Sequence, residues 1–223
     1  MEEFSDTRRL PVYLVLDTSG SMAGDPIEAV KEGLQTMFTE LKGDPQTLEI
    51  GWLSIITFDD KAEVKLPFTW IGQAQTPQGI RAQGTTAMGS ALELLTNCID
   101  GEVRKHTKEQ KGDWKPLVFL MTDGQPTDGN RWQSALKDLK KRVSVKIIAC
   151  AAGGAADVNL LEQIAGPENV VRLRDASSQN IKKFIELVTA SIKTSSDKIG
   201  QGQAAPDVIY IGDKDDEGYL RIP

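Results

Sequence analysis

Histidine and cysteine are scarce in this sequence of 223 residues, which contains one His and two Cys. A single histidine, His106, excludes a zinc site with several His ligands and argues against a His-based catalytic triad. Cys98 and Cys150 lie far apart, each within an apolar pattern, so we expect buried thiols rather than a disulfide or a metal-binding pair. The commonest nucleophilic and zinc-dependent chemistries are therefore disfavoured.

The sequence also lacks a basic block and a long hydrophobic run. Its formal net charge is −6, and its Lys and Arg residues are scattered, which disfavours nucleic-acid binding. No apolar stretch approaches the roughly 20 residues of a membrane span. Residues 1–6 are acidic, whereas a secretory signal begins basic and continues apolar. We therefore expect a cytoplasmic protein without a membrane span.

What the sequence does contain is an alternation of strand and helix patterns. Residues 12–16 form a continuous hydrophobic run, as in a strand covered on both faces. A helix pattern follows, with Asp25 as the expected N-cap and Pro26 at the first helical position. Two strands, 48–58 and 62–68, are joined by a short connection, which indicates an antiparallel edge hairpin. The remaining expected elements are helices near 92–103, 132–143, 160–164 and 181–192, and strands at 117–121, 145–150 and 170–173.

This order predicts an α/β fold with a doubly wound, mostly parallel sheet, one antiparallel edge strand and helices on both faces. We expect a short extension at residues 1–8 and one domain at 9–195. A Ser/Gly/Gln/Ala-rich linker is expected at 196–206. The acidic tail, 207–223, has two β-type segments that are predicted to form a hairpin. Because two strands alone are marginal in water, they would dock on this domain or on a partner.

Oxygen-bearing side chains follow two of the predicted strands. Asp17, Ser19 and Ser21 come directly after the first strand, and Asp123 follows the strand that begins at Leu117. In open parallel sheets, ligands collect beyond the carboxyl ends of strands near the point where strand order reverses. A third hydroxyl-bearing loop, 84–89, directly precedes a helix. Carboxylates and hydroxyls suit a hard divalent cation such as Mg²⁺, with Mn²⁺ or Ca²⁺ as alternatives.

Each of these residues has a structural alternative when it is taken alone. Asp17 and Asp123 occur in turn-forming contexts, and the two serines could cap a helix. Other acidic residues are better explained without a metal: Asp25 as a helix cap, and Asp59, Asp60 and Asp128 as turn residues. Trp70 and Ile71 are either ordinary packed residues or an exposed contact surface near the metal.

Three sequence segments together resemble the metal-ion-dependent adhesion site of von Willebrand factor type A domains. The segments are Asp17-x-Ser19-x-Ser21, Thr86-Ala87-Met88-Gly89-Ser90-Ala91-Leu92 and Phe119-Leu120-Met121-Thr122-Asp123-Gly124. The resemblance spans nearly all of residues 9–195 and implies a Rossmann-like fold of this family. It also implies that Ser19 and Ser21 ligate Mg²⁺ through their hydroxyls, and that Asp17 and Asp123 act largely through bridging waters.

The resemblance further implies that Thr86 binds the metal directly or through water. The family commonly has Gly-Gly-Thr before this helix, whereas this chain has Gly84-Thr85-Thr86. We assign Thr86 from its spacing to Gly89 and keep Thr85 as the weaker candidate.

By the same resemblance, the chain is expected to be a non-enzymatic scaffold that binds a carboxylate of a partner protein through the metal. The segment Arg8 to Asp17 is similar to that of stand-alone TerY-like proteins, which are associated with bacterial tellurium resistance. That similarity implies a role in stress signalling with a protein kinase and a PP2C-type phosphatase.

Two alternatives remain open at this stage. The first is a Mg²⁺-dependent phosphohydrolase, in which an Asp after a hydrophobic strand is the nucleophile. Such enzymes need a second carboxylate two residues later, where this chain has Ser19. The second alternative is that acidic residues of the tail, Asp213 to Glu217, complete the metal coordination of the same chain or of a neighbouring copy.

Overall fold

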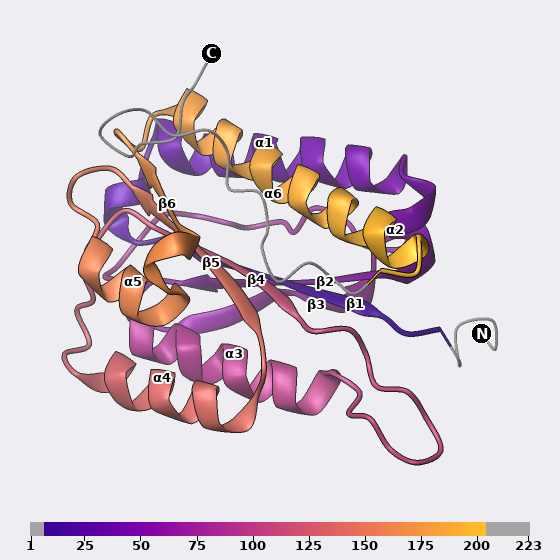
Figure 1. The fold of residues 1–223 in the computed structure, drawn as a ribbon. Coiled ribbons are helices and arrows are strands. Elements are labelled where there is room, and N and C mark those ends of the chain that lie inside the picture. Colours follow the sequence, from indigo (N-terminus) through magenta and orange to yellow (C-terminus); the bar gives the residue numbers. More distant parts are fainter. Residues whose placement is uncertain (1–6, 204–223) are drawn as a thin grey trace.

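Six strands form one sheet within residues 7–203, the part of the chain that the computed structural model describes (Figure 1). The strands are β1 Leu10–Asp17, β2 Gly51–Phe58, β3 Ala62–Trp70, β4 Leu117–Thr122, β5 Lys146–Ala152 and β6 Val170–Leu173. Their order is β3-β2-β1-β4-β5-β6, and every neighbouring pair is parallel except β2 with β3. The predicted doubly wound sheet with one antiparallel edge strand is confirmed.

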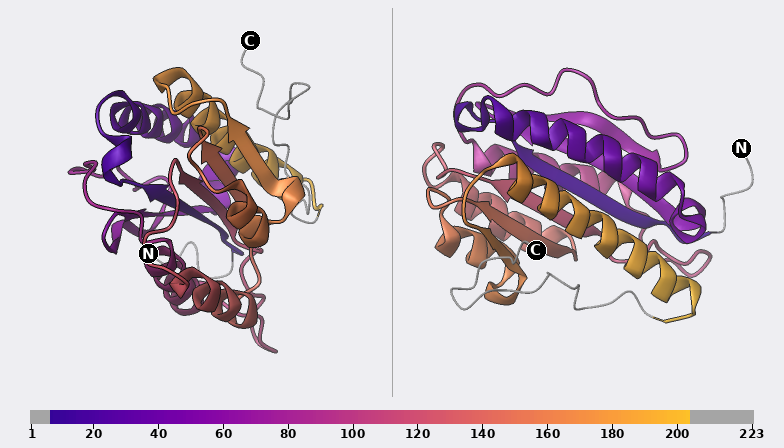
Figure 2. Two further views of the ribbon diagram at one scale, coloured as in Figure 1. Left: turned by 90° about the vertical axis from the view of Figure 1, so that its left-hand side faces the viewer. Right: turned by 90° about the horizontal axis from the view of Figure 1, so that it is seen from above.

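Helices cover both faces of this sheet (Figures 1 and 2). One face carries α1 Asp25–Lys42, α2 Pro45–Ile50 and α6 Ser178–Gly200. The other face carries α3 Met88–Glu102, α4 Arg131–Arg142 and α5 Val158–Ala165. Two short 3₁₀ turns complete the described elements, at Gly20–Met22 and Pro167–Asn169.

The central strand β1 explains the continuous hydrophobic run near the start of the sequence. All eight of its residues are buried. Val12 and Leu14 face the core under α1 and α6, whereas Tyr13 and Val15 face the core under α3 and α4. A strand that is covered on both faces needs apolar residues at successive positions, not at alternate ones.

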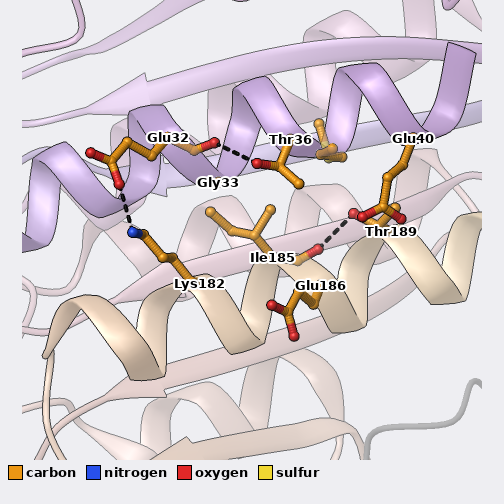
Figure 3. A pocket seen from close by; sticks show the side chains of 9 residues that line it. Glu32, Gly33, Thr36, Glu40, Lys182, Ile185, Glu186 and Thr189 are labelled. Atoms are coloured by element: carbon orange, nitrogen blue, oxygen red, sulfur yellow. Dashed lines mark hydrogen bonds and ion pairs between the residues drawn. The ribbon is translucent and has the colours of Figure 1, made fainter.

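Helices α1 and α6 pack closely at Gly33. A β-carbon built on Gly33 would lie 2.4 Å from Cδ1 of Ile185, so only a residue without a side chain allows this approach without a shift of Ile185. Beside the contact lies a shallow pocket of about 140 Å³. Figure 3 shows its lining residues, including the ion pair in which Lys182 Nζ lies 2.6 Å from a Glu32 oxygen.

The first turns of α1 and α2 differ from the sequence prediction. The N-cap of α1 is Gly24, with φ of 85°, and Asp25 is the first helical residue. Residues 48–50, which were predicted to begin a strand, instead end α2. Asp44 caps this helix by accepting a hydrogen bond from the Thr47 backbone N–H, and Pro45 occupies its first position. The cap and the proline that follows it favour a helix, and they outweigh the strand-like alternation of Leu48-Glu49-Ile50.

Helix α6 extends beyond the predicted domain end. Residues 196–200, which were predicted as linker, are helical, because Ser195 and Ser196 are buried and Ile199 packs against the core. The Ser195 hydroxyl donates to the Ser191 carbonyl, so a polar side chain is accommodated inside the helix packing. The predicted tail hairpin, 207–223, lies outside the described residues, as does most of the predicted N-terminal extension.

Two further expectations concern cysteines and membrane segments. Both cysteines are free thiols; Cys150 is buried and Cys98 is partly buried. Among residues 7–203, no helix combines the length and apolar character that crossing a bilayer requires.

Candidate metal centre

The candidate site lies where the strand order of the sheet reverses. From β1 the chain leads first to β2 and β3 on one side, and later returns to β4 on the other side. β1 and β4 are parallel neighbours, with Leu16 opposite Met121, so their carboxyl ends emerge side by side. Such a switch point leaves a crevice between the two following loops. Asp17 ends β1, and Asp123 directly follows β4.

Asp17 is fully buried and holds the two loops together. Its Oδ1 accepts a hydrogen bond from the Ser19 backbone N–H at 2.7 Å, and its Oδ2 accepts one from the Thr122 hydroxyl. Both carboxylate oxygens are therefore engaged by the loops that carry the other candidate ligands. The Asp17 side chain therefore fixes the geometry of the two loops and is not exposed to solvent.

Ser19, Ser21 and Asp123 form a direct chain of hydrogen bonds. The Ser21 hydroxyl donates to Asp123 Oδ1 at 2.8 Å, and the Ser19 and Ser21 hydroxyl oxygens lie 3.0 Å apart. Because the proton of Ser21 is directed to Asp123, Ser19 is the donor of the second hydrogen bond. Ser19 is buried whereas Ser21 is exposed, so the cluster opens to solvent on the side of Ser21.

The loop before α3 brings a third hydroxyl to the same place. Thr86 is buried, and its Oγ1 lies 3.2 Å from the position that a β-carbon on Gly124 would occupy. The Gly20 backbone N–H donates to the Gly84 carbonyl at 3.1 Å, which ties this loop to the loop after β1. The structure therefore brings four of the predicted residues, namely Asp17, Ser19, Ser21 and Asp123, into one hydrogen-bonded cluster, with Thr86 beside it.

Thr85 is engaged elsewhere. Its backbone N–H and its hydroxyl both donate to Asp60 Oδ1, at 2.9 and 2.8 Å. A β-carbon on Gly84, where φ is 66°, would lie 2.7 Å from the Asp60 carboxyl group. Asp60 therefore occupies the space beside Gly84 and turns Thr85 away from the cluster. This contact favours Thr86 over Thr85 as the candidate ligand.

Sequence reasoning classified Asp128 as a turn residue and did not consider Thr127. Thr127 holds the Thr86 loop through two hydrogen bonds: its hydroxyl accepts from the Thr86 N–H, and its own N–H donates to the Thr86 carbonyl. Asp128 Oδ2 accepts from the Ser90 N–H in the first turn of α3, and its Oδ1 is buried without a hydrogen-bond partner among the described residues. Turn residues of the loop after β4 thus position the loop before α3.

The electrostatics of the cluster favour a cation. Burial raises the pKa of Asp17 to about 6, although hydrogen bonds from Ser19 and Thr122 oppose the shift. Burial also raises the pKa of Asp123. Within the described range, neither carboxylate pairs with Lys, Arg or His. Two buried carboxylates without a basic partner are unfavourable together, and a bound cation would offset that cost.

The donor set fits a hard divalent cation and not a soft one. The cluster offers carboxylate and hydroxyl oxygens only, which suit Mg²⁺, Mn²⁺ or Ca²⁺. No group of three or more His, Cys, Asp or Glu side chains that could hold a metal occurs in residues 7–203. A metal site at this cluster therefore needs the serine and threonine hydroxyls as ligands. Because these hydroxyls are neutral, they leave the charge of the ion only partly compensated.

Trp70 and Ile71 do not lie near this cluster. Trp70 pairs with Trp52 at the beginning of β2, and its indole N–H donates to the Leu48 carbonyl at 2.6 Å. Ile71 is fully buried in the core. Since β3 is antiparallel, its end lies at the opposite edge of the sheet from Asp17. Of the two interpretations, packed residues is therefore the correct one, and neither residue belongs to a contact surface around the metal.

Comparison with known proteins identifies the fold and the family. The profile of the von Willebrand factor type A domain matches residues 12–197. The pilus adhesin SpaC of Lactobacillus rhamnosus GG has the same fold, with a TM-score of 0.69 and 16% identity over 85% of this chain and 31% of the adhesin. The same holds for proximal thread matrix protein 1 of the mussel byssus, solved with a zinc-occupied adhesion-site motif. It has a TM-score of 0.57 and 18% identity, over 84% of this chain and 48% of that one.

A curated relative, an uncharacterized protein of Synechocystis sp., is 31% identical over 129 residues. The match covers 55% of this chain and 27% of the relative. The curated relatives that match are much longer proteins, of which this chain spans between 12% and 27%.

Proposed function

The chain belongs to the von Willebrand factor type A domain family, and we propose that it is a non-enzymatic module that binds a partner protein through a divalent metal. Asp17, Ser19, Ser21, Thr86 and Asp123 would hold the ion. Domains of this family are commonly interaction modules that bind a divalent metal. When bound, the metal would supply a Lewis-acidic position that accepts a carboxylate oxygen of an Asp or Glu from the partner.

The observation that carries this proposal is the hydrogen-bonded chain from Ser19 through Ser21 to Asp123 at the switch point of the sheet. Ser21 and Asp123 are 102 positions apart in the sequence and lie in two different loops, which only the fold brings together. Ser21 is exposed, so an outside ligand has access to the cluster. A purely structural turn would not need this convergence of oxygens beside an exposed hydroxyl.

We propose Mg²⁺ as the ion, because oxygen ligands and an open position suit it. The mussel protein was solved with zinc in this motif, so Zn²⁺ is the competitor to test. Competition between Mg²⁺, Mn²⁺ and Zn²⁺ in one titration would rank them for this chain.

The similarity to TerY-like proteins supports a finer proposal, namely action with a protein kinase and a PP2C-type phosphatase in tellurium resistance or stress signalling. The test is reconstitution of the chain with the kinase and the phosphatase of its own source. We expect complex formation in Mg²⁺ and its loss with a chelator. Equal binding in both conditions would contradict a metal-mediated contact.

The alternative function, a Mg²⁺-dependent phosphohydrolase, receives no support from the geometry. Asp17 would be the nucleophile, but the residue is fully buried and both carboxylate oxygens accept hydrogen bonds from Ser19 and Thr122. Ser19, two residues later, has no acid/base function near neutral pH. Sustained metal-dependent release of phosphate from p-nitrophenyl phosphate would overturn this conclusion.

The decisive experiment for the interaction is capture of partner proteins on the immobilised full chain, in Mg²⁺ and in chelator. Ser19→Ala and Ser21→Ala should abolish the metal-dependent captures while circular dichroism remains unchanged. Ser134→Ala is the matched control, because Ser134 lies on the exposed face of α4 and, among residues 7–203, its hydroxyl bonds only to the Arg131 carbonyl. A partner that both site variants retain would contradict the proposal.

A further inference from the structure

A second, larger pocket lies at the opposite edge of the sheet from the candidate metal centre. Its volume is about 680 Å³, and its lining includes residues within two positions of the start of three parallel strands: Arg8 before β1, Pro116 before β4 and Ser144 before β5. A cavity of this size is in the range of ligand-binding sites. The metal-dependent function proposed above does not involve it.

The pocket is strongly basic in a chain whose net charge is −6. Its lining includes the cationic residues Arg8, Arg104, Lys105, Lys111, Lys115 and Arg142. The one acidic lining residue, Asp113, is fully buried and bound by Arg9 and Arg104, so its charge is compensated within the protein. The pocket therefore presents uncompensated positive charge to a ligand.

Two of these cations are available to a ligand. Lys105 and Arg142 each pair with Asp100, and Arg8 lies over the ring of Trp114 at 3.6 Å from its centroid. Within the described range, Lys111 and Lys115 have neither a hydrogen bond nor an ion pair. The pocket wall also has an apolar part, formed by Ile99, Val103 and Val143. A ligand that carries both carboxylates and apolar side chains would match this lining.

The described chain ends at the same edge of the sheet. The last turn of α6 lies beside α2, because a β-carbon on Gly200 would meet the Gln46 side chain just before β2 begins. Ile199 of α6 and Trp114 of the pocket pack against the same core cluster. Figures 1 and 2 both show the end of α6 and the loop that leads to β4 on the same side of the molecule.

The sequence after Gln203 has the matching chemistry. Four of the five residues from 213 to 217 are acidic, and the fifth is Lys214. Apolar segments flank them at 208–211 and 219–222. We propose that the basic pocket binds this acidic segment, residues 207–223 of the same chain. The carboxylates would lie against Lys111 and Lys115, and the apolar residues would cover the apolar wall.

Distance favours the basic pocket over the metal centre as the site of this segment. Asp213 is the tenth residue after Gln203, so a fully extended chain reaches at most about 35 Å. The metal centre lies at the far end of β1, whose eight residues span about 26 Å. Asp213 would need about three quarters of this extended reach to cover the length of β1 alone, whereas the pocket lies at the edge of the sheet where α6 ends. A tethered segment also has a high effective concentration at a site within reach.

Zero-length carbodiimide crosslinking of the full chain in chelator, followed by mass spectrometry, tests the proposal directly. We expect Lys111 or Lys115 to be coupled to Asp213, Asp215, Asp216 or Glu217 within a monomer. Lys137 and Lys141 are the matched controls, because they are exposed on α4 and not in the pocket. Equal coupling of the tail to these lysines would overturn the proposal. So would coupling of the pocket to Glu2, Glu3 or Asp6, or between two copies.

A binding assay gives the second readout. The probe is a fluorescent peptide of residues 207–223, and the receptor is the full chain with a neutralised tail (Asp213→Asn, Asp215→Asn, Asp216→Asn, Glu217→Gln). We expect Lys111→Glu with Lys115→Glu to weaken binding at least tenfold, and Lys137→Glu with Lys141→Glu to change it less than twofold. Chelator should have no effect. Binding that requires Mg²⁺ and is lost in Ser19→Ala would instead place the segment at the metal centre and overturn the proposal, leaving the metal site itself intact.

Discussion

The hydroxyl of Ser21 donates a hydrogen bond to Oδ1 of Asp123, 2.8 Å away, and thereby joins the loop after β1 to the loop after β4. The two residues come from opposite sides of the point where the strand order reverses. Ser21 and Asp123 would both contribute oxygens to holding a divalent cation, the first as a neutral hydroxyl and the second as a carboxylate. This contact is therefore a sensitive place to test the metal centre.

Ser21→Ala should weaken Mn²⁺ binding about 10- to 100-fold, the range typical for loss of one metal-site interaction. The fold should persist, because Ser21 is exposed and no core residue depends on it. Calorimetric titration with Mn²⁺ measures the affinity, and thermal unfolding in chelator measures the stability. The same substitution at Ser134 should leave both unchanged; unchanged Mn²⁺ affinity in Ser21→Ala would exclude Ser21 as a ligand.

The stability of the metal-free protein should depend on pH through Asp17. Burial raises the pKa of Asp17 in the folded state to about 6, above the unfolded value of about 4. The folded state therefore binds the proton more tightly, and the free energy of unfolding decreases as pH rises from about 4 to 6, by about 3 kcal/mol from this group. Above that window the contribution is constant.

Urea unfolding in chelator at pH 4, 5, 6 and 7 measures this dependence. Subtraction of the same series for Asp17→Asn isolates the contribution of Asp17, and saturating Mg²⁺ should reduce the loss at pH 7 because the metal binds the deprotonated carboxylate. Parallel pH profiles for the two proteins would show that Asp17 does not titrate in this window.

Gly89 in the first turn of α3 is expected to tolerate no side chain. A β-carbon there would lie 2.7 Å from the backbone nitrogen of Trp132 in α4, and the backbone cannot move as a flexible side chain can. We expect Gly89→Ala to destabilise the fold by about 1–3 kcal/mol. It should also weaken metal binding, because Thr86 lies three residues earlier.

Gly101 of the same helix is the matched control, since a β-carbon on it meets nothing within 4 Å. Gly101→Ala should stabilise the protein by about 0.5–1 kcal/mol through helix propensity. Denaturant unfolding compares the two variants. If Gly89→Ala were as stable as Gly101→Ala, the close approach of α3 and α4 would be incorrect.

Asp113 is expected to be important for stability, because its buried carboxylate binds Arg9 and Arg104. Burial would raise the pKa of Asp113, but the hydrogen bonds and charge of Arg9 and the Arg104 backbone N–H lower it below its usual value. Its stabilisation is therefore present above about pH 4 and decreases as pH falls through the lowered pKa.

Asp113→Asn should cost about 3 kcal/mol or more, because it leaves two arginines without their buried partner. Asp138→Asn, which breaks the exposed pair with Arg142, should cost less than about 1 kcal/mol. Chemical denaturation at pH 7 compares the two. Equal costs would show that burial of Asp113 does not strengthen its ion pairs.

The sequence predicted the parallel sheet well, because strands that are covered on both faces leave continuous apolar runs such as residues 12–16. It failed at residues 48–50, where an Asp44 cap and Pro45 start a helix inside a strand-like pattern. It also placed the cap of α1 one residue late, since a glycine with positive φ takes the place of a side-chain cap. Local patterns do not resolve competition between neighbouring signals of similar strength.

The candidate ligands were recognisable from the sequence because each one follows a strand or precedes a helix. Their supports were not, because Asp60, Thr127 and Asp128 act across 25 to 41 positions of sequence. Short polar turn residues look alike whether they hold another loop or only turn the chain. The basic pocket was missed for the same reason, since Arg8, Lys111 and Arg142 are brought together only by the fold.

We propose above all that the cluster around Ser19, Ser21 and Asp123 holds a divalent cation with a coordination position open to an outside carboxylate. Water-proton relaxation of the full chain titrated with Mn²⁺ measures both features at once. We expect one bound Mn²⁺ with enhanced relaxation from an exchangeable water, and loss of this ion in Ser19→Ala. No bound Mn²⁺, or a bound ion that Ser19→Ala retains, would contradict it.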